Sequence, residues 1–272
     1  MSNTEKGTTM PTRDTAPIGA PCWLDLMTSD TERSREFYCQ LFGWTAEEPN
    51  ENFGGYFNFL RDGAQIAGGM ARPPDYQGPD VWSIYLATDD TRKTVDAATA
   101  NGGQVIVPAM DIADLGTMAV ITEPGGAATG LWQAGLHKGF GVLGEPGAPA
   151  WFELQTRDFP AAVSFFRELF GLEAHPLQDT PEFRYTILKQ GETWLAGVMD
   201  ASNSLPDGVP SHWTVIFGIE DTDAALSKIS ELGGSVVRPA EDSPYGRLAA
   251  AVDPTGAHFG LAGPNAADAA SG

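Results

Sequence analysis

Four side chains that can carry protons lie in segments predicted to be strands. Asp25 lies in the strand expected at 23–28 and Glu153 in its counterpart at 151–156, while His212 and His258 begin two later apolar runs. A carboxylate beside imidazoles can exchange protons with a substrate, and two histidines with one carboxylate also have the composition of a metal site. These four residues are the candidate catalytic groups. The structural alternative is that the carboxylates hydrogen-bond neighbouring strands and the histidines fill space.

Strand alternation predicts which side chains accompany these groups. Successive side chains point to opposite faces of a strand, and the uniformly apolar set, such as Leu24 and Leu26, is expected under a helix. The other, concave face of each half is here called its cup. The ligand-binding candidates in the two cups are Trp23, Met27, Ser83 and Tyr85 in the first half, and Trp151, Gln155 and Thr214 in the second. An indole offers a flat stacking surface and one N–H donor, which suits an aromatic ligand, although it can also plug a cavity.

The segments that carry these residues belong to an internal repeat. Residues 21–44 align without a gap on residues 149–172 with nine identities in 24 positions, and the likeness continues downstream in the same order. Each copy reads as a strand, a helix and further strands, and then the same plan again. The pattern predicts an α+β protein of two tandem domains, at 21–132 and 149–263. A linker is expected at 133–148, with His137 in solvent, and disordered tails at 1–20 and 264–272.

Composition narrows the classes of partner. The chain has 272 residues and a formal net charge of −20, which repels nucleic acid and anionic lipid. No apolar run is long enough to span a membrane, and the polar first twenty residues do not read as a signal peptide. Two cysteines make no disulfide framework. We therefore expect a cytoplasmic protein without nucleic-acid or membrane partners, either a monomer with an internal pseudo-dimer or a homodimer.

The landmarks of the repeat resemble those of a known family. In each half a strand is followed by an aspartate, a helix that ends in F-[YF]-x-x-L-F-G, and a final strand; in the second half that strand follows D-P-T-G. This order resembles the vicinal oxygen chelate superfamily, which includes glyoxalases, bleomycin resistance proteins and extradiol dioxygenases, and in particular the tandem glyoxalase-like proteins of actinomycetes. The resemblance implies two glyoxalase-like domains, each of two βαβββ units that form a cupped mixed sheet with helices outside.

The resemblance also implies three metal-ligand positions in each half. They fall on Trp23, near Ser83 and on Gly130 in the first half, and on Trp151, near Thr214 and on Gly260 in the second. Indole and glycine offer no ligand to a divalent metal. We therefore expect neither a metal nor another cofactor at these positions.

Three functions are compatible with these observations. The first is a metal-independent tailoring enzyme that uses acid–base chemistry on an aromatic or polyketide-type metabolite in antibiotic or secondary metabolism. The second is a non-catalytic protein that sequesters a drug or metabolite. The third is a metal-dependent lyase or dioxygenase of glyoxalase type built on Glu153, His212 and His258. The extra acid–base residues of the second half favour the enzyme, but the choice of working half stays open.

Overall fold

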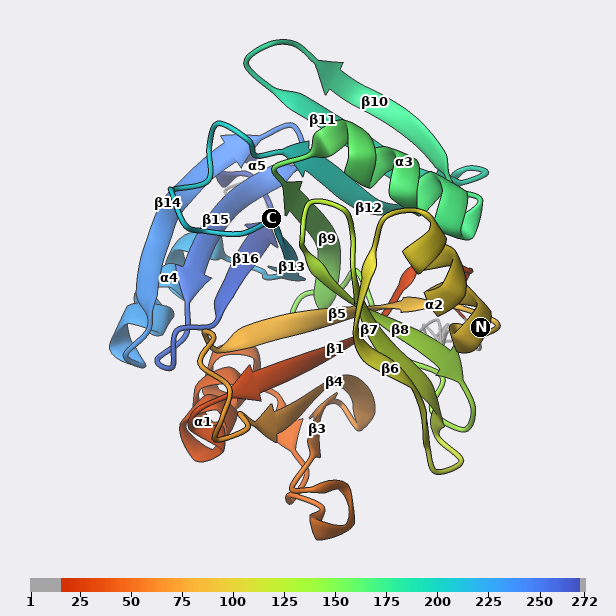
Figure 1. Ribbon diagram of the computed structural model, residues 1–272. Helices are drawn as coiled ribbons and strands as arrows, with labels where there is room; N and C mark the ends of the chain where they lie inside the picture. The colour runs from red at the N-terminus through yellow and green to blue at the C-terminus, as the bar shows by residue number, and fades with distance from the viewer. Residues whose placement is uncertain (1–15, 270–272) are drawn as a thin grey trace, which may run out of the picture.

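The computed structural model describes residues 16–269, which form two halves of equal plan (Figure 1). The first half contains β1 (Pro21–Thr28), α1 (Thr31–Phe42), β2 (Thr45–Ala46), β3 (Phe57–Arg61), β4 (Ala64–Ala71), β5 (Val81–Ala87), α2 (Thr91–Ala100), β6 (Gln104–Ile112), β7 (Gly116–Thr122) and β8 (Ala128–Ala134). The second half contains β9 (Pro149–Thr156), α3 (Phe159–Phe170), β10 (Glu173–Asp179), β11 (Arg184–Gln190), β12 (Thr193–Asp200), β13 (His212–Gly218), α4 (Thr222–Glu231), β14 (Ser235–Ser243), β15 (Gly246–Val252), β16 (His258–Gly263) and α5 (Ala266–Ala269).

Each half folds into one eight-stranded mixed sheet. The strand orders are β2-β3-β4-β1-β5-β8-β7-β6 and β10-β11-β12-β9-β13-β16-β15-β14, so the two sheets have the same topology. The central strands β1 and β5 pair antiparallel, whereas β1 with β4 and β5 with β8 pair parallel. The predicted fold of two tandem domains, each of two βαβββ units, is confirmed.

The first helix of each half begins after the aspartate and ends at the glycine of the repeated pattern. The Asp30 carboxylate accepts a hydrogen bond from the Arg33 N–H, and Gly43 ends α1 in the left-handed conformation at φ 71°. The Asp158 carboxylate and Gly171, at φ 66°, do the same for α3. A side-chain acceptor satisfies an unpaired N–H at the helix start, and glycine adopts positive φ at little cost.

The helix-covered faces of the two sheets share one apolar core. Phe217 of β13 packs against Phe42 of α1 and against Trp44, with ring centroids 5.0 and 5.5 Å apart. The indole N–H of Trp213 donates to the Thr129 hydroxyl of the other half at 2.9 Å. The two repeats are therefore joined by packing as well as by the chain, and their cups face away from the shared core.

Two predicted boundaries are corrected within the described residues. Residues 16–20 were expected to belong to a disordered tail, but Gly19 donates its N–H to Ala87 O and Ala20 is buried. At the other end α5 lies inside the tail expected at 264–272. The remaining tail residues, 1–15 and 270–272, lie outside the described part of the chain. Among the helices that the structure describes, none is long and apolar enough to cross a membrane.

Candidate functional site

A cavity of about 480 Å³ lies in the first cup. Trp23, Tyr85, Met118 and Trp132 contribute apolar and aromatic surface to its lining, and Asp25, Tyr56 and His137 contribute polar groups. This mixture of broad aromatic walls and a few polar side chains is typical of a small-molecule site. The cavity is therefore the candidate functional site.

Sheet register explains why Trp23, Asp25 and Tyr85 share the concave face. Trp23 lies opposite Tyr85 on β5, and Tyr85 lies opposite Gly130 on β8. Asp25 lies between Ser83 on one neighbouring strand and Gly68 on the other. Residues directly opposite one another point to the same face of a sheet. Met27 and Ser83 occupy this face as well, but they lie outside the lining of the cavity.

The carboxylate of Asp25 is the centre of a buried hydrogen-bond network. It accepts from the Tyr56 hydroxyl at 2.7 Å and from the Trp23 indole N–H at 3.0 Å, and it also interacts with the Tyr85 hydroxyl. Burial raises the pKa of Asp25, because the loss of hydration outweighs the stabilisation that these donors give to the anion. Burial and the neighbouring Asp25 carboxylate raise the pKa of both Tyr56 and Tyr85 well above the ordinary value of a tyrosine. These shifts favour the protonated forms of all three groups.

Gly68 on β4 makes room for this network. A Cβ at this position would overlap the Tyr56 hydroxyl and crowd the Asp25 carboxylate. Because Gly68 has no side chain, the hydroxyl of Tyr56, which lies just before β3, can reach the carboxylate of Asp25 on β1.

His137 belongs to the wall of the cavity, which corrects the expectation that it lies in solvent. The segment after β8 returns over the first cup, and its Phe140 N–H donates to Cys22 O. The imidazole packs edge-to-face on Trp23, with ring centroids 4.3 Å apart, and Trp132 donates its indole N–H to the His137 carbonyl at 3.0 Å. Burial lowers the pKa of His137 to about 4, so the neutral imidazole predominates at neutral pH.

Neither ring nitrogen of His137 has a hydrogen-bond partner within the described part of the chain, and Nε2 is buried. Buried polar groups are normally paired, so the unpaired Nε2 of His137 is an exception within the cavity wall. The sequence analysis placed His137 in the linker. The second half has no histidine at the corresponding place, so the repeat did not indicate it as a site residue either.

The second cup repeats part of the same network. The Trp151 indole N–H donates to the Tyr185 hydroxyl at 2.9 Å, and Tyr185 in turn hydrogen-bonds Glu153. Gln155 donates to Glu153 at 3.4 Å. Burial raises the pKa of Glu153 despite the opposing effects of Tyr185, Arg238 and Gln155. Gly197 plays the part of Gly68, because a Cβ there would overlap the Tyr185 hydroxyl.

The second cup lacks a tyrosine at the position of Tyr85 and a histidine at the position of His137. Ile216 occupies the position of Tyr85, since it lies opposite both Trp151 and Gly260. His212 and Thr214 share the concave face with Gln155 and Glu153, as strand register requires. His212 Nδ1 lies 2.9 Å from Pro210 O, and His258 is exposed.

No set of three or more His, Cys, Asp or Glu side chains is grouped to hold a metal ion among residues 16–269. Glu153, His212 and His258 are therefore not brought together as a three-ligand site. Of these three side chains, the two histidines interact: partial burial of the His258 imidazole and repulsion from His212 lower the pKa of His258.

The residues at the positions where the resemblance implies metal ligands do not fit a metal in either half. One ligand position was expected near Ser83 in the first half and near Thr214 in the second. The residues that lie directly opposite Trp23 and Trp151 are instead Tyr85 and Ile216. A Cβ at Gly130 would overlap the ring of Tyr85, and one at Gly260 would lie 2.8 Å from Ile216 Cγ1. The space that a ligand side chain needs on β8 or β16 is therefore filled from the neighbouring strand.

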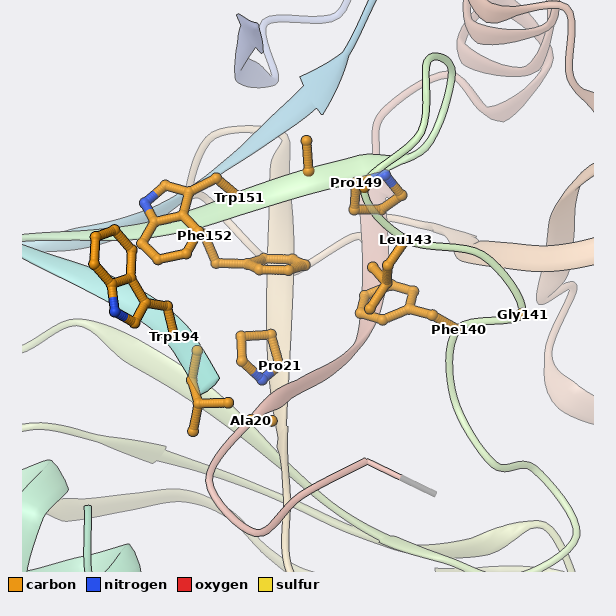
Figure 2. Close-up of a pocket in the computed structure, with 12 residues that line it drawn as sticks. Ala20, Pro21, Phe140, Gly141, Leu143, Pro149, Trp151, Phe152 and Trp194 are labelled. Atoms are coloured by element: carbon orange, nitrogen blue, oxygen red, sulfur yellow. The ribbon is translucent and has the colours of Figure 1, made fainter. Parts of the chain in front are cut away.

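A separate groove of about 310 Å³ lies beside the second cup (Figure 2). Trp151, Phe152 and Trp194 line it from the second half, together with Pro21 and Phe140 from the first. Of the predicted second-cup residues only Trp151 contributes to its lining. It holds no charged side chain, so it offers apolar contact but no proton transfer.

Tyr56 and Tyr185 were missed by the analysis of single strands. Their signal is present in the repeat, because each lies 11 residues before the alanine of an A-G-x-M segment, at 67–70 and 196–199. The second half has one residue more between the glycine that ends the helix and the tyrosine, which hides the match from an ungapped alignment.

Comparison with known proteins agrees with this architecture. The family model described as the Glyoxalase/Bleomycin resistance protein/Dioxygenase superfamily matches residues 22–130 and 148–261. CFP32 of Mycobacterium tuberculosis, whose name classes it with the glyoxylases, is 38% identical over 94% of this chain and 98% of its own. The anthracycline biosynthesis protein DnrV of Streptomyces peucetius is 37% identical over 89% of this chain and 92% of its own.

Solved structures show the same fold at much lower identity. The 2,3-dioxygenase LapB of Pseudomonas sp. KL28 superposes with a TM-score of 0.64 at 14% identity, and covers 92% of this chain and 94% of its own. The Mn(II)-bound glyoxalase of Novosphingobium aromaticivorans gives a TM-score of 0.60 at 16% identity, over 90% of this chain and 82% of its own. The duplicated sheets, the family match over both halves and these relatives lead to one conclusion: the chain belongs to the glyoxalase/bleomycin resistance protein/dioxygenase superfamily.

Proposed function

We propose that this protein is a metal-independent tailoring enzyme that performs acid–base chemistry on a polycyclic aromatic, polyketide-type metabolite in the first cup. The observation that carries the proposal is the joint placement of Asp25, Tyr56, Tyr85 and His137 around one aromatic-walled cavity. The carboxyl and phenol groups can donate protons, and the neutral imidazole can accept one.

Two further observations support this choice of pocket and substrate. Trp23 and Trp132 contribute aromatic groups to the lining of the cavity, which suits contact with fused aromatic rings. The similarity to DnrV and to DauV of Streptomyces sp. strain C5, both anthracycline biosynthesis proteins, supports a substrate of that chemical class. Because the donor set at the family's metal positions does not fit a metal, no step of the reaction is assigned to one.

The alternative function is sequestration of a similar ligand without turnover. It needs the aromatic walls but not the imidazole of His137 or the carboxyl group of Asp25, whose pKa burial raises. The presence of both in one cavity favours the enzyme.

The test is incubation of the protein with anthracyclinone and anthraquinone compounds, followed by separation and mass analysis of the products. Binding is measured in parallel from the quenching of tryptophan fluorescence. Asp25→Asn is expected to lower turnover by 100-fold or more with dissociation constants changed less than tenfold. Binding of these compounds without any product in the unchanged protein would establish the sequestration function instead.

A matched Glu153→Gln variant identifies the working cup. If the first cup is the active one, this variant keeps turnover within a few-fold of the unchanged protein. Loss of turnover in Glu153→Gln alone would move the active site to the second cup and contradict the proposal.

A further inference from the structure

The groove beside the second cup has an equivalent place in the first half, where the chain covers it. Residues 138–144, here called the strap, follow β8 and cross the starts of β1 and β4. The Phe140 N–H donates to Cys22 O at 2.9 Å, and the Gly141 N–H donates to Gln65 O at 2.7 Å. The strap is therefore held on these two strands by its main chain.

The strap places one aromatic ring between two glycines. Phe140 is 4% exposed, and its ring centroid lies 5.8 Å from that of Trp23. Gly139 has a φ of 98°, and a Cβ at this residue would overlap Cys22 O. A Cβ at Gly141 would lie 2.9 Å from a side-chain atom of β4. The close approach of the strap to β1 and β4 therefore requires glycine on both sides of the aromatic residue.

The repeat identifies the same place in the second half. Ala150 is the counterpart of Cys22, and each is passed over in the pairing of its strand with the neighbouring central strand. Trp194 is the counterpart of Gln65, because each is the second residue of its strand, β12 or β4, in sheets of the same topology. Ala150, Trp151 and Trp194 all line the groove. The groove thus lies where the first half carries its strap.

Within residues 16–269 the second half supplies no strap of its own. The chain after β16 turns to the hairpin of β14 and β15, where the Asn265 side chain donates to Ser243 O at 3.0 Å, and no residue beyond β16 lines the groove. Trp194 is left 46% exposed. Trp151 and Trp194 lie on one side of the groove, opposite Phe140 (Figure 2). Exposed aromatic surface of this kind is typical of a binding site.

Charge and connectivity restrict what can occupy the groove. Its lining contains no charged side chain, and the chain has a net charge of −20. An acidic segment would lose hydration there without gaining an ion pair, and the protein would repel it. A second copy of this chain cannot supply its strap, because the strap is already bound to its own β1 and β4. The occupant therefore comes from another protein.

We propose that this groove docks an extended segment of a partner protein, with an aromatic residue between two glycines and no acidic residue. The main chain of the segment donates to Ala150 O and Trp194 O, and its aromatic ring lies beside Trp151 and Trp194. Main-chain hydrogen bonds supply affinity and the ring supplies specificity, as in other cases where a peptide adds to the edge of a strand. This inference does not rest on the function proposed for the first cup.

The probe that tests the groove is the strap itself as a synthetic peptide. A fluorescein-labelled peptide with the sequence of residues 138–144, KGFGVLG, is mixed with the full chain, and binding is followed by fluorescence anisotropy. We expect saturable binding with a dissociation constant below about 1 mM. The same peptide with alanine in place of phenylalanine should bind at least about tenfold more weakly.

Variants of the protein locate the bound peptide. Trp194→Ala should weaken binding by at least about tenfold, and Trp194→Phe should stay within about threefold of the unchanged protein. Tyr245→Ala, at another exposed aromatic residue of the second half, is the matched control and should bind normally. Hydrogen-exchange mass spectrometry of the unchanged protein should show that the peptide protects residues 149–152 and 193–195. This measurement locates the peptide even if Trp194→Ala does not fold.

Three results would overturn the docking groove. The first is absence of binding at about 1 mM peptide. The second is equal binding by folded Trp194→Ala, or protection that is confined to other segments. The third is a dimer of the unchanged chain that Trp194→Ala dissociates, because the groove would then be an interface between two copies. Each of these results leaves the function proposed for the first cup unaffected.

Discussion

Asp25 is a buried carboxyl group with several hydrogen-bond donors, and the balance between burial and these donors determines its pKa. The residue is 7% exposed, and burial raises its pKa although Tyr56, Tyr85 and Trp23 all favour the anion. Such a group destabilises the native state once pH rises above the pKa of the unfolded chain, because the unfolded carboxyl group ionises first. Functional sites commonly retain such unfavourable groups.

Asp25→Asn should therefore be more stable than the unchanged protein near neutral pH while being less active. The difference in the free energy of unfolding should grow as pH rises above about 4, since only the unchanged protein has a carboxyl group at position 25 that ionises on unfolding. Urea denaturation at several pH values between 4 and 8 measures it. Asp75→Asn, at an exposed aspartate, is the control. A difference independent of pH would contradict the raised pKa of Asp25.

His137 predicts a pH dependence of the opposite sign. Its pKa is about 4 in the folded protein and is lowered from 6.5 by burial, so the unfolded chain takes up this proton first as pH falls. The native state is therefore destabilised as pH falls from 6.5 to 4, by about 3 kcal/mol in total, because the folded imidazole stays neutral while the unfolded one takes up a proton. His137→Gln should lack this loss, so the two unfolding curves should converge or cross as pH is lowered. Parallel curves from pH 8 to 4 would show that His137 is not buried.

At the scale of elements, the neighbouring strands β5 and β8 share the space on the concave face of the sheet between Tyr85 and Gly130. Tyr85 fills the volume in front of Gly130, and the same space in the second half is filled by Ile216 in front of Gly260. Gly130→Ala should displace the Tyr85 ring, with a loss of about 1–3 kcal/mol in stability and weaker ligand binding in the first cup. Gly260→Ala is the matched control, which should lose stability but keep ligand binding.

The double variant Gly130→Ala with Tyr85→Ala tests the cause. With the ring removed the new methyl group has room, so the cost of Gly130→Ala should largely disappear in that background. Unfolding measurements on the four proteins of this cycle give the coupling. Additive losses would mean that the alanine strains the backbone rather than the tyrosine.

At the scale of the whole molecule, the two halves share a core and should unfold together. Phe217 of the second half is fully buried against Phe42, Trp44 and Trp82 of the first. Phe217→Ala should lower the free energy of unfolding by about 3–5 kcal/mol and leave a single transition for both halves. Calorimetry and denaturation followed by fluorescence measure it. A shift of only one of two separate transitions would show that the halves unfold independently.

Much of the architecture was predictable because it depends on local, repeated patterns. The caps at Asp30 and Gly43 delimit α1, and strand alternation correctly set Trp23, Asp25 and Tyr85 on one face. The first cup itself was harder to predict. Tyr56 and His137 lie 31 and 112 residues from Asp25 along the chain, and neither stands in a local pattern that points to the cavity.

The sequence by itself determined the duplicated α+β fold and the family, because periodicity, caps and side-chain identity are local properties. Only the tertiary structure decided which groups meet. It placed His137 against Trp23, and it left Glu153, His212 and His258 without a common site. The physical reason is that these contacts depend on how the return of the chain after β8 and the register of separate strands place side chains in space, which no short stretch of sequence encodes.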